Sequence, residues 1–337
     1  MRLTISIIIP CRNEERYIGS CLDSILSNGF DSNRLEIVVV DGMSDDRTRT
    51  IVKQYTDQNP NIKMLDNLKK ATPVALNLGI INSTGDVIFR VDAHARLEKG
   101  YISECIKYLY AWNTDNVGGI MKTLSQNDSR MGKAIAIALS HPFGVWNSYF
   151  RIHSNKTKWV DTVFGGCYRR DVFQRIGFFN ENLIRGQDLE FNLRLKKYGG
   201  RTLLVPDIIS YYYARSDLKS FWEHNWTNGE WAILPFLYST IMPVSWRHLV
   251  PLFFVIGLLM SIIFALISFK LIWIFILLFG TYGLMNLAVS LLIFIKEKNI
   301  FYLVLMPLSF VSLHIAYGLG SLYGLVKALS IFFFRFS

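Results

Sequence analysis

Short hydrophobic runs and helical patterns alternate over the first 91 residues of the chain. The runs are rich in β-branched residues and stop at Pro, Gly or Asp, which is typical of strands buried on both faces of a parallel sheet. They lie at residues 5–9 (ISIII), 35–40 (LEIVVV), 62–65 and 87–91 (VIFRV). Between them, apolar positions three and four residues apart predict helices at residues 14–26, 44–55 and 72–80. This alternation predicts a mostly parallel α/β sheet flanked by helices.

A different pattern occupies the end of the chain, where long apolar stretches replace the alternation. Three stretches, at residues 250–269, 271–295 and 300–326, contain no charged residue. Each is as long as the roughly 20 residues that cross a hydrocarbon core. One buried helix of a soluble protein could explain a single stretch, but three in succession favour a membrane. We therefore expect a transmembrane helical region at residues 250–337, preceded by an interfacial linker at residues 231–249.

Basic residues give a partial indication of orientation. Arg247 and the Lys296/Lys298 loop both face the cytoplasm if the first two stretches cross the membrane and return, as the positive-inside rule requires. A third full crossing then places Lys327 and Arg335 outside, so a re-entrant or tilted third segment is the alternative. The shorter apolar stretch at residues 131–150 either lies at the membrane surface or packs onto the C-terminal helices.

Charge divides the chain in the same way. The net charge is +10, but residues 250–337 hold only five of the 36 basic and one of the 26 acidic residues. The basic residues are spread along the chain without a basic block, so we expect membrane lipid and not nucleic acid as a partner. The four cysteines lack metal-site spacing, which favours reduced, isolated thiols.

Polar residues gather where the predicted strands end. In a parallel sheet, ligands bind beyond the carboxyl ends of the strands. Any one of these loops is also a common turn or helix start, but three together favour a nucleotide site. The residues are Pro10, Arg12, Asn13 and Glu14 after the first strand, Asp41 and Ser44 after the second, and Asp92 and His94 after the fourth.

Five strings in order extend this pattern over residues 4–230, namely PCRNEE, VVVDGMSDDRT, ATPVALNLGIINSTGDVIFRVDAHA, VDTVFGGCYRRDVF and IRGQDLEFNLRLKKYGG. The chain thereby resembles the inverting family 2 glycosyltransferases of GT-A fold. The strings RVDAHA, HPFGVWNS and YYYARSDL look most like succinoglycan-type glucosyltransferases, which assemble exopolysaccharide on a lipid carrier. The resemblance implies a GT-A domain at residues 1–230, with a nucleotide half at 1–120 and an acceptor half at 121–230.

The resemblance also implies roles for individual residues in binding the donor. Asp41 would hydrogen-bond the base, usually uracil, and Asp92 would lie against the ribose and diphosphate. The remaining nucleotide-sugar contacts would come from Pro10, Arg12, Asn13, Glu14, Ser44, Asp45, Gly165, Gly166, Gln187 and Arg215. The two glycines would let the backbone approach the sugar closely, and Arg215 could bind a diphosphate.

The metal and the catalytic base follow from two further motifs. Asp92 and His94 stand at the family's D-x-D metal motif, with His94 in place of the second carboxylate. Since imidazole suits Mn²⁺ better than Mg²⁺, we expect Mn²⁺ to be favoured. Gln187-Asp188 stands at the family's E-D position, where the second carboxylate is the general base. The alternative for Asp188 is an N-cap without a catalytic role.

These implications describe a membrane-bound inverting transferase. It would move a hexose from a UDP-sugar to a polyprenyl-diphosphate-linked saccharide in exopolysaccharide or cell-surface glycan assembly. We expect it in the cytoplasmic (inner) membrane as a multi-pass protein with its catalytic domain in the cytoplasm. The alternatives are a polyprenyl-monophosphate sugar synthase and a catalytically inactive GT-A membrane scaffold. A transporter is disfavoured because the apolar stretches hold no acidic residue.

Overall fold

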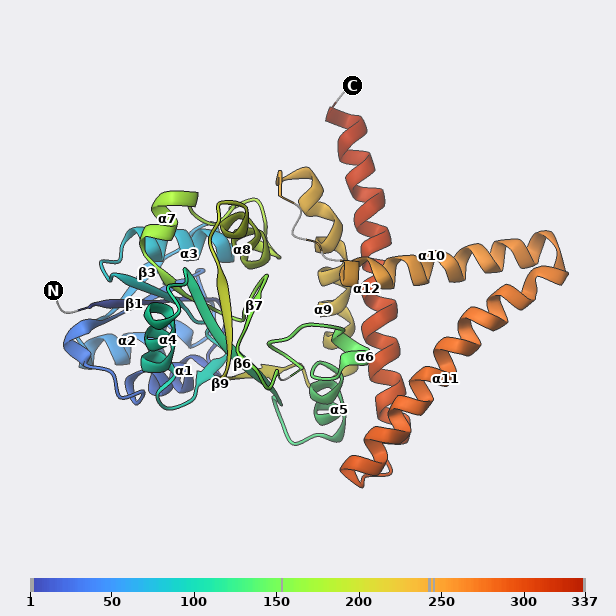
Figure 1. The fold of residues 1–337 in the computed structure, drawn as a ribbon, viewed down its shortest axis with the longest axis horizontal. Helices are drawn as coiled ribbons and strands as arrows, with labels where there is room; N and C mark the ends of the chain where they lie inside the picture. The colour runs from blue at the N-terminus through green and yellow to red at the C-terminus, as the bar shows by residue number, and fades with distance from the viewer. Residues whose placement is uncertain (1–2, 153, 242–243, 245, 336–337) are drawn as a thin grey trace. The chain divides into compact units, whose positions relative to one another are not determined.

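The computed structural model of the protein describes residues 3–152, 154–241, 244 and 246–335 (Figure 1). The chain divides into two compact units, each built from two stretches of sequence. The sheet unit comprises residues 1–122 and 149–213, and the helical unit comprises residues 123–148 and 214–337. Residues 123–148, which belong to the helical unit, therefore interrupt the sequence of the sheet unit.

A mixed β-sheet forms the centre of the sheet unit. Four parallel strands come first in the chain, and they are β1 (Ile5–Cys11), β2 (Leu35–Asp41), β3 (Ile62–Asp66) and β4 (Val87–Arg90). The later strands are β5 (Ala95–Leu97), β6 (Asn116–Ser125), β7 (Lys158–Val160), β8 (Cys167–Arg169) and β9 (Thr202–Ala214). The order across the sheet is β3-β2-β1-β4-β8-β6-β9-β5, and β7 pairs with β9. The predicted α/β class and the four predicted strands are confirmed.

Helices cover the sheet and follow the predicted alternation. They are α1 (Ile18–Leu26), α2 (Thr48–Gln58), α3 (Thr72–Ile81), α4 (Tyr101–Ala111), α7 (Asp171–Ile176) and α8 (Gln187–Lys197), with a 3-10 turn η1 (Ser32–Arg34). The first two helices begin later than residues 14 and 44, where we expected them. The reason is that the two loops bond to each other. The Asp46 carboxylate accepts from the backbone N–H groups of Glu15 and Thr48.

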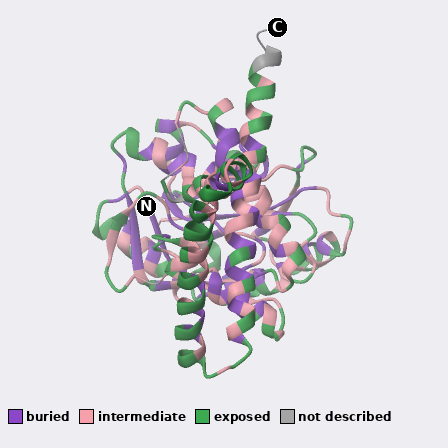
Figure 2. Ribbon diagram, turned by 90° about the vertical axis from the view of Figure 1, so that its right-hand side faces the viewer, coloured by how far each residue is buried: buried purple, intermediate pink, exposed green. Residues whose placement is uncertain are grey.

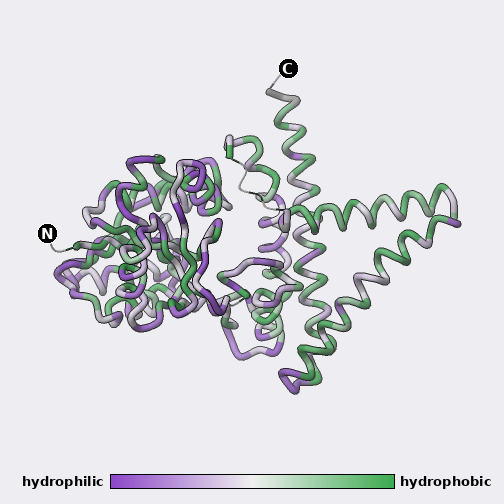
Figure 3. The backbone as a smooth tube through the Cα atoms, in the orientation of Figure 1, coloured by the Kyte–Doolittle hydropathy of each residue, from purple (hydrophilic) through white to green (hydrophobic). Residues whose placement is uncertain are grey.

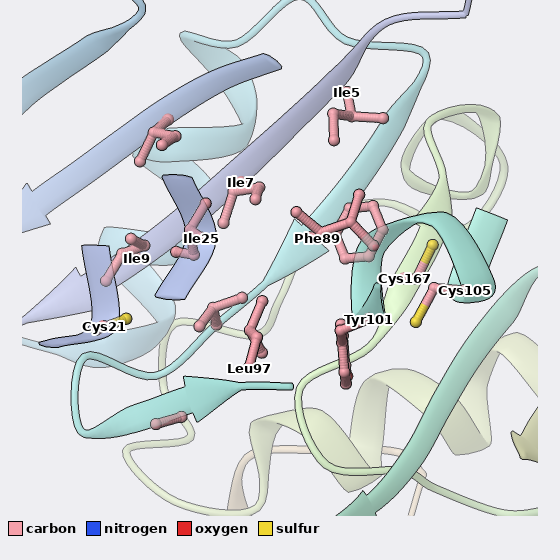
Figure 4. Packing of buried hydrophobic residues seen from close by; sticks show 14 of the residues in the cluster. Ile5, Ile7, Ile9, Cys21, Ile25, Phe89, Leu97, Tyr101, Cys105 and Cys167 are labelled. Carbon is pink, nitrogen blue, oxygen red and sulfur yellow. The ribbon is translucent and has the colours of Figure 1, made fainter. Parts of the chain in front are cut away.

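The parallel strands are buried on both faces, as their uninterrupted apolar sequences predict. Alternate residues of β1, among them Ile5, Ile7 and Ile9, pack in the cluster shown in Figure 4 together with Phe89 of β4. Ile8 points to the opposite face, where it belongs to a second cluster with α3 and α8. All four cysteines are buried and free of disulfides, as expected.

The helical unit begins with short helices and ends with three long ones. It contains α5 (Arg130–Ala138), α6 (Pro142–Val145), α9 (Leu218–Ile233), η2 (Leu234–Leu237), α10 (Trp246–Ile267), η3 (Phe269–Leu271), α11 (Ile272–Glu297) and α12 (Tyr302–Arg335). Within the stretch 131–150, α5 and Phe143 of α6 pack onto the C-terminal helices, in a buried cluster with Tyr302, Met306 and Phe310. The packing alternative is therefore the one that the structure adopts.

In the part of the chain that the structure describes, three helices are long and apolar enough to cross a membrane, at His248–Ile267, Phe269–Glu297 and Tyr302–Phe332. Figure 3 shows α10 and α11 as hydrophobic along most of their length, with hydrophilic residues at their ends. Most residues of α10 and α11 are exposed or partly exposed (Figure 2). The third stretch forms one continuous helix of 34 residues through Pro307, without the break that a re-entrant segment would have.

His314 of α12 has a structural explanation within the helical unit. Its Nδ1 lies 3.0 Å from the Tyr282 hydroxyl of α11, and its Nε2 lies 3.0 Å from the Phe143 carbonyl of α6. One side chain thereby joins three helices, which suits a polar residue at an apolar interface.

Candidate active site

The loops after β1 and β2 form one hydrogen-bonded surface at the sheet edge. In the register of the two strands Cys11 lies opposite Asp41, so their loops begin at the same level. The Ser44 hydroxyl accepts from the Asn13 N–H at 2.9 Å, and the Asn13 side-chain oxygen accepts from the Asp45 N–H at 3.1 Å. Asn13 has a φ of +57°, a left-handed conformation that asparagine tolerates. Arg12, Asn13 and Asp45 are exposed, and Pro10 is partly exposed.

Asp41 lies beneath this surface and bonds to the protein itself. Its side chain is fully buried, and its Oδ2 accepts from Arg49 at 2.6 Å and from the Ser44 N–H at 3.0 Å. Its Oδ1 accepts from the Ser44 hydroxyl at 2.5 Å. These contacts hold the loop after β2 in shape, and any contact of Asp41 with a base would be added to them.

The loop after β4 carries Asp92 and His94. Burial disfavours the charged form of Asp92, but the nearby guanidinium of Arg90 and His94 lower the pKa of this carboxyl below its usual range. The Nδ1 of His94 lies 2.9 Å from Oε1 of Glu14, which joins the loops after β1 and β4. The His94 ring also packs edge-on against Tyr212 of β9.

A buried arginine connects this loop with the start of α8. Arg90, the last residue of β4, is 9% exposed. Its Nη2 donates to Oδ1 of Asp92 at 3.0 Å, and its Nη1 lies 3.3 Å from Oδ2 of Asp188. The structure thus brings Asp92 and Asp188 to the two terminal nitrogens of one guanidinium.

Asp188 is not the N-cap of its helix. The cap position of α8 is Gly186, and Asp188 stands in the first turn, where its Oδ1 accepts from the Leu189 N–H at 2.9 Å. About a third of the Asp188 side chain is exposed. Gln187, by contrast, is buried. A carboxylate that is partly open to solvent at a helix N-terminus can accept a proton from an incoming group.

The two glycines of the FGG string lie directly beside Arg90. The Arg90 N–H donates to the Gly166 carbonyl at 3.0 Å. A Cβ at Gly165 would stand 2.7 Å from the Arg90 carbonyl oxygen, and Gly165 has a φ of +68°. Both the close approach and the left-handed backbone require glycine at this position.

Most of the predicted site residues thus fall in loops of the sheet unit that bond to one another. Arg215 directly follows β9 and is exposed in the helical unit, so its role stays a prediction. Arg90 and the pairing of Glu14 with His94 were not foreseen. The signal for Arg90 was visible as a single charge inside the otherwise apolar run VIFRV.

Asp92 and His94 can contribute only part of a metal site. Among the described residues, no group of three His, Cys, Asp or Glu side chains could hold an ion. One carboxylate oxygen and one imidazole nitrogen form a mixed oxygen and nitrogen set, which fits Mn²⁺. A metal would require the remaining ligands from the donor diphosphate and water. The Glu14 contact at Nδ1 resembles the carboxylate that orients a ligating histidine in metal sites.

The fold and this edge of the sheet have the GT-A-like arrangement, a curled mixed sheet with flanking helices. Residues 6–177 match glycosyl transferase family 2. The chain therefore belongs to glycosyltransferase family 2.

Several known proteins are similar to this chain. A dolichyl N-acetyl-α-D-glucosaminyl phosphate 3-β-D-2,3-diacetamido-2,3-dideoxy-β-D-glucuronosyltransferase of Methanococcus voltae is 31% identical over 97% of this chain and 99% of its own length. The succinoglycan biosynthesis protein ExoA of Rhizobium meliloti is 27% identical over 73% of this chain and 74% of its own. The solved structure of a mannosyltransferase from Pyrobaculum calidifontis, in complex with GDP-mannose and Mn²⁺, aligns with a TM-score of 0.60. It covers 96% of this chain and 88% of its own at 16% identity, which shows a shared fold.

Proposed function

We propose that the protein is a membrane-bound inverting glycosyltransferase that moves a sugar from a UDP-sugar to a saccharide on a polyprenyl carrier. The observation that supports this most strongly is the pairing of Asp92 and Asp188 on the Arg90 guanidinium. Asp92 is at the family's donor-binding motif and Asp188 at the family's base position. A donor and an acceptor bound beside these two carboxylates would meet at one place.

The chemistry would be a single displacement. The acceptor hydroxyl attacks the anomeric carbon as the bond to the UDP oxygen breaks, and Asp188 takes the hydroxyl proton. One base without a protein nucleophile inverts the anomeric centre, so a UDP-α-sugar gives a β-linkage. A bound divalent metal would neutralise charge on the leaving diphosphate. Asp92 and His94 would hold it, and Mn²⁺ is the ion we propose.

The name of one relative supports a particular kind of acceptor. The Methanococcus voltae relative is named for a dolichyl-linked N-acetylglucosaminyl phosphate and for a β-linked product. It matches this chain over the helical region as well as the sheet. We therefore propose a polyprenyl-linked saccharide as acceptor. A diphosphate linkage, expected from the sequence, and the phosphate linkage of the relative's name are separate cases for experiment. An exopolysaccharide or another cell-surface glycan would be the end product.

The helical unit would keep the enzyme at its lipid substrate. We propose that α10, α11 and α12 span the cytoplasmic membrane, with the sheet unit in the cytoplasm where UDP-sugars are available. Their length and hydropathy support the crossing. The orientation is supported by the positive residues that flank them.

Transfer by the full-length enzyme in lipid nanodiscs tests the proposal. A panel of UDP-sugars is offered with polyprenyl phosphate, polyprenyl-phosphate N-acetylglucosamine and polyprenyl-diphosphate N-acetylglucosamine, with and without Mn²⁺. We expect a β-linked disaccharide lipid, identified by mass spectrometry and NMR, from one of the two saccharide acceptors. Transfer to the bare lipid phosphate alone would instead establish a monophosphate sugar synthase. Mn²⁺-dependent UDP binding without turnover would indicate an inactive scaffold.

A pair of aspartate variants tests the base. Asp188→Asn should lower kcat by about 10²- to 10⁴-fold, the usual contribution of general base catalysis. Asp171→Asn is the matched control. Asp171 also stands in the first turn of a helix and pairs with an arginine, Arg175, at 3.2 Å. Equal activity of Asp188→Asn and the wild type would remove Asp188 from the mechanism.

A further inference from the structure

We propose that Arg90 is a positioning residue for the transfer reaction, holding Asp92 on the donor side and Asp188 on the acceptor side in one fixed arrangement. The inference rests on the proposed function and assigns a role to the arginine of the RVDAHA string, to which the sequence analysis gave none. Arg90 would not touch the reacting atoms. It would set the separation of the two carboxylates between which the reaction takes place.

The contacts of the guanidinium are divided between the two carboxylates. Nη2 donates to Asp92 at 3.0 Å, and Nη1 stands 3.3 Å from Asp188 without a hydrogen bond between them. The two nitrogens belong to one rigid plane, so a shift of Arg90 moves both contacts together. The positive charge between them also offsets the repulsion of two nearby carboxylates.

Arg90 is costly as a structural residue. Its neighbours Ile88, Phe89 and Val91 are buried and apolar, as expected of a central parallel strand. In their midst, the Nε and Nη1 of Arg90 are buried without hydrogen-bond partners. Unsatisfied buried donors destabilise a protein, and an apolar residue would avoid that cost. The placement of a charge here is therefore better explained by Asp92 and Asp188 than by the stability of the strand.

The main chain of Arg90 is held on both sides. On one side Arg90 pairs with Ile8 of β1, and on the other its N–H donates to the Gly166 carbonyl. The close approach of Gly165 to the Arg90 carbonyl adds a steric limit. Because the backbone is fixed in this way, the Cα from which the Arg90 side chain extends has a defined position. The FGG string thus supports the site through Arg90 as well as through any direct contact with a sugar.

Two substitutions at Arg90 test the proposed role, with kcat and KM for the UDP-sugar measured separately. Arg90→Met removes the charge at similar length, and Arg90→Lys keeps the charge but loses the planar fork. We expect Arg90→Met to lower kcat by about 100-fold, the scale of a 1 Å misplacement. The kcat of Arg90→Lys should stay below about a tenth of the wild-type value, because an ammonium does not reproduce the planar fork of the guanidinium.

A double-mutant cycle separates positioning from a general loss of folding. Because Arg90 holds Asp92 as well as Asp188, Arg90→Met should still lower kcat in the Asp188→Asn background, but by clearly less than the roughly 100-fold loss expected in the wild type. The control is Arg194→Lys on the same helix as Asp188. Arg194 is also largely buried and pairs with Glu190 at 3.0 Å, but it bonds to the Ile176 and Phe178 carbonyls. We expect this control to lower the melting temperature while kcat per folded enzyme stays within about threefold of the wild type.

The outcomes are distinct. An active wild type with Arg90→Met within threefold of its kcat would overturn the role of Arg90 and leave the proposed function intact. Full additivity of Arg90→Met and Asp188→Asn would overturn it in the same way, as would an equal kcat loss in Arg194→Lys. A wild type that transfers no sugar to any lipid acceptor would reject the proposed function, and the inference with it. If Arg90→Met does not fold, the same cycle is run with Arg90→Lys.

Discussion

Strand β1 and helix α11 are both almost wholly apolar, yet their side chains have opposite surroundings. Ile5, Ile7, Ile8 and Ile9 of β1 are 0% exposed. Leu277 and Leu284 of α11 are 70% and 71% exposed. The strand finds its apolar neighbours within the protein, whereas the helix leaves a large apolar surface uncovered, which soluble proteins avoid. A hydrophobic run can therefore indicate either a buried strand or a helix with an exposed apolar surface, and the number of residues in the run distinguishes the two.

The largest expected effect concerns the membrane itself. If the exposed apolar surface of α10 and α11 faces lipid, the full-length protein should stay in the membrane fraction after high-salt and alkaline carbonate washes. Detergent should release it, because only detergent replaces the lipid around the helices. Immunoblots of supernatant and pellet measure this. Release of the protein by salt alone would mean that the helices are not inserted.

A matched pair of alanine substitutions compares the two regions directly. Ile7→Ala should lower the free energy of unfolding by about 2–5 kcal/mol, since it leaves a cavity in a packed core. Leu277→Ala should change it by less than about 0.5 kcal/mol, because the side chain lies outside the protein core. Thermal or denaturant unfolding of the detergent-solubilised protein gives both values. Equal losses would mean that α11 is packed as tightly as the sheet.

Within the helical unit, glycines sharpen the comparison further. A Cβ at Gly229 of α9 would stand 2.0 Å from the Tyr317 carbonyl of α12, whereas Gly283 of α11 has nothing within 4 Å. Gly229→Ala should therefore cost about 1–3 kcal/mol through overpacking. Gly283→Ala should be nearly neutral. Melting temperatures of the two variants in one detergent test this, and a neutral Gly229→Ala would show that α9 and α12 separate readily.

The smallest expected effect is on acid stability. Glu36 of β2 is partly buried, and hydrogen bonds from Lys63, Ser6 and the Thr84 N–H outweigh desolvation and lower its pKa. A lowered pKa in the folded state adds stability that is present above the unfolded pKa of about 4.3 and is lost as pH falls through the folded pKa.

Glu36→Gln should therefore reduce the unfolding free energy at neutral pH by about 1 kcal/mol and flatten its decline below pH 4.5. Asp57→Asn serves as the control, since Asp57 is exposed and pairs with Lys53 of its own helix. Denaturant unfolding between pH 3 and 7 measures both. An unchanged pH profile for Glu36→Gln would exclude this contribution.

The sequence predicted the four parallel strands and the long apolar helices well because their signals are local. A β-branched run such as residues 5–9 indicates a strand by its own composition, and an apolar stretch such as 250–269 indicates a long helix in the same way. Helix starts were less accurate. Residues 14–17 and 44–47 continue a helical pattern, but tertiary bonds such as Asp46 to the Glu15 N–H hold them as loops.

The residues of the candidate site could be proposed from the sequence, but the contacts between them could not. Strand ends and motif order led to Asp92 and Asp188 separately, although 96 positions separate them in the chain. Their meeting depends on where α8 begins relative to β4, which no local pattern describes. The role of Arg90 could not be predicted for the same reason, because it depends on contacts with Asp92 and Asp188 that the pairing of the strands does not reveal.

The buried thiols have a practical consequence for mapping the protein. Burial raises the pKa of Cys11 and of Cys21, so both thiols resist modification, and Cys105 and Cys167 are equally enclosed. The native protein should therefore give little background with maleimide reagents while it is folded. A cysteine introduced beside Lys270 or Lys298 would then be labelled on its own, and a membrane-impermeant reagent would report on which side of the bilayer each loop lies.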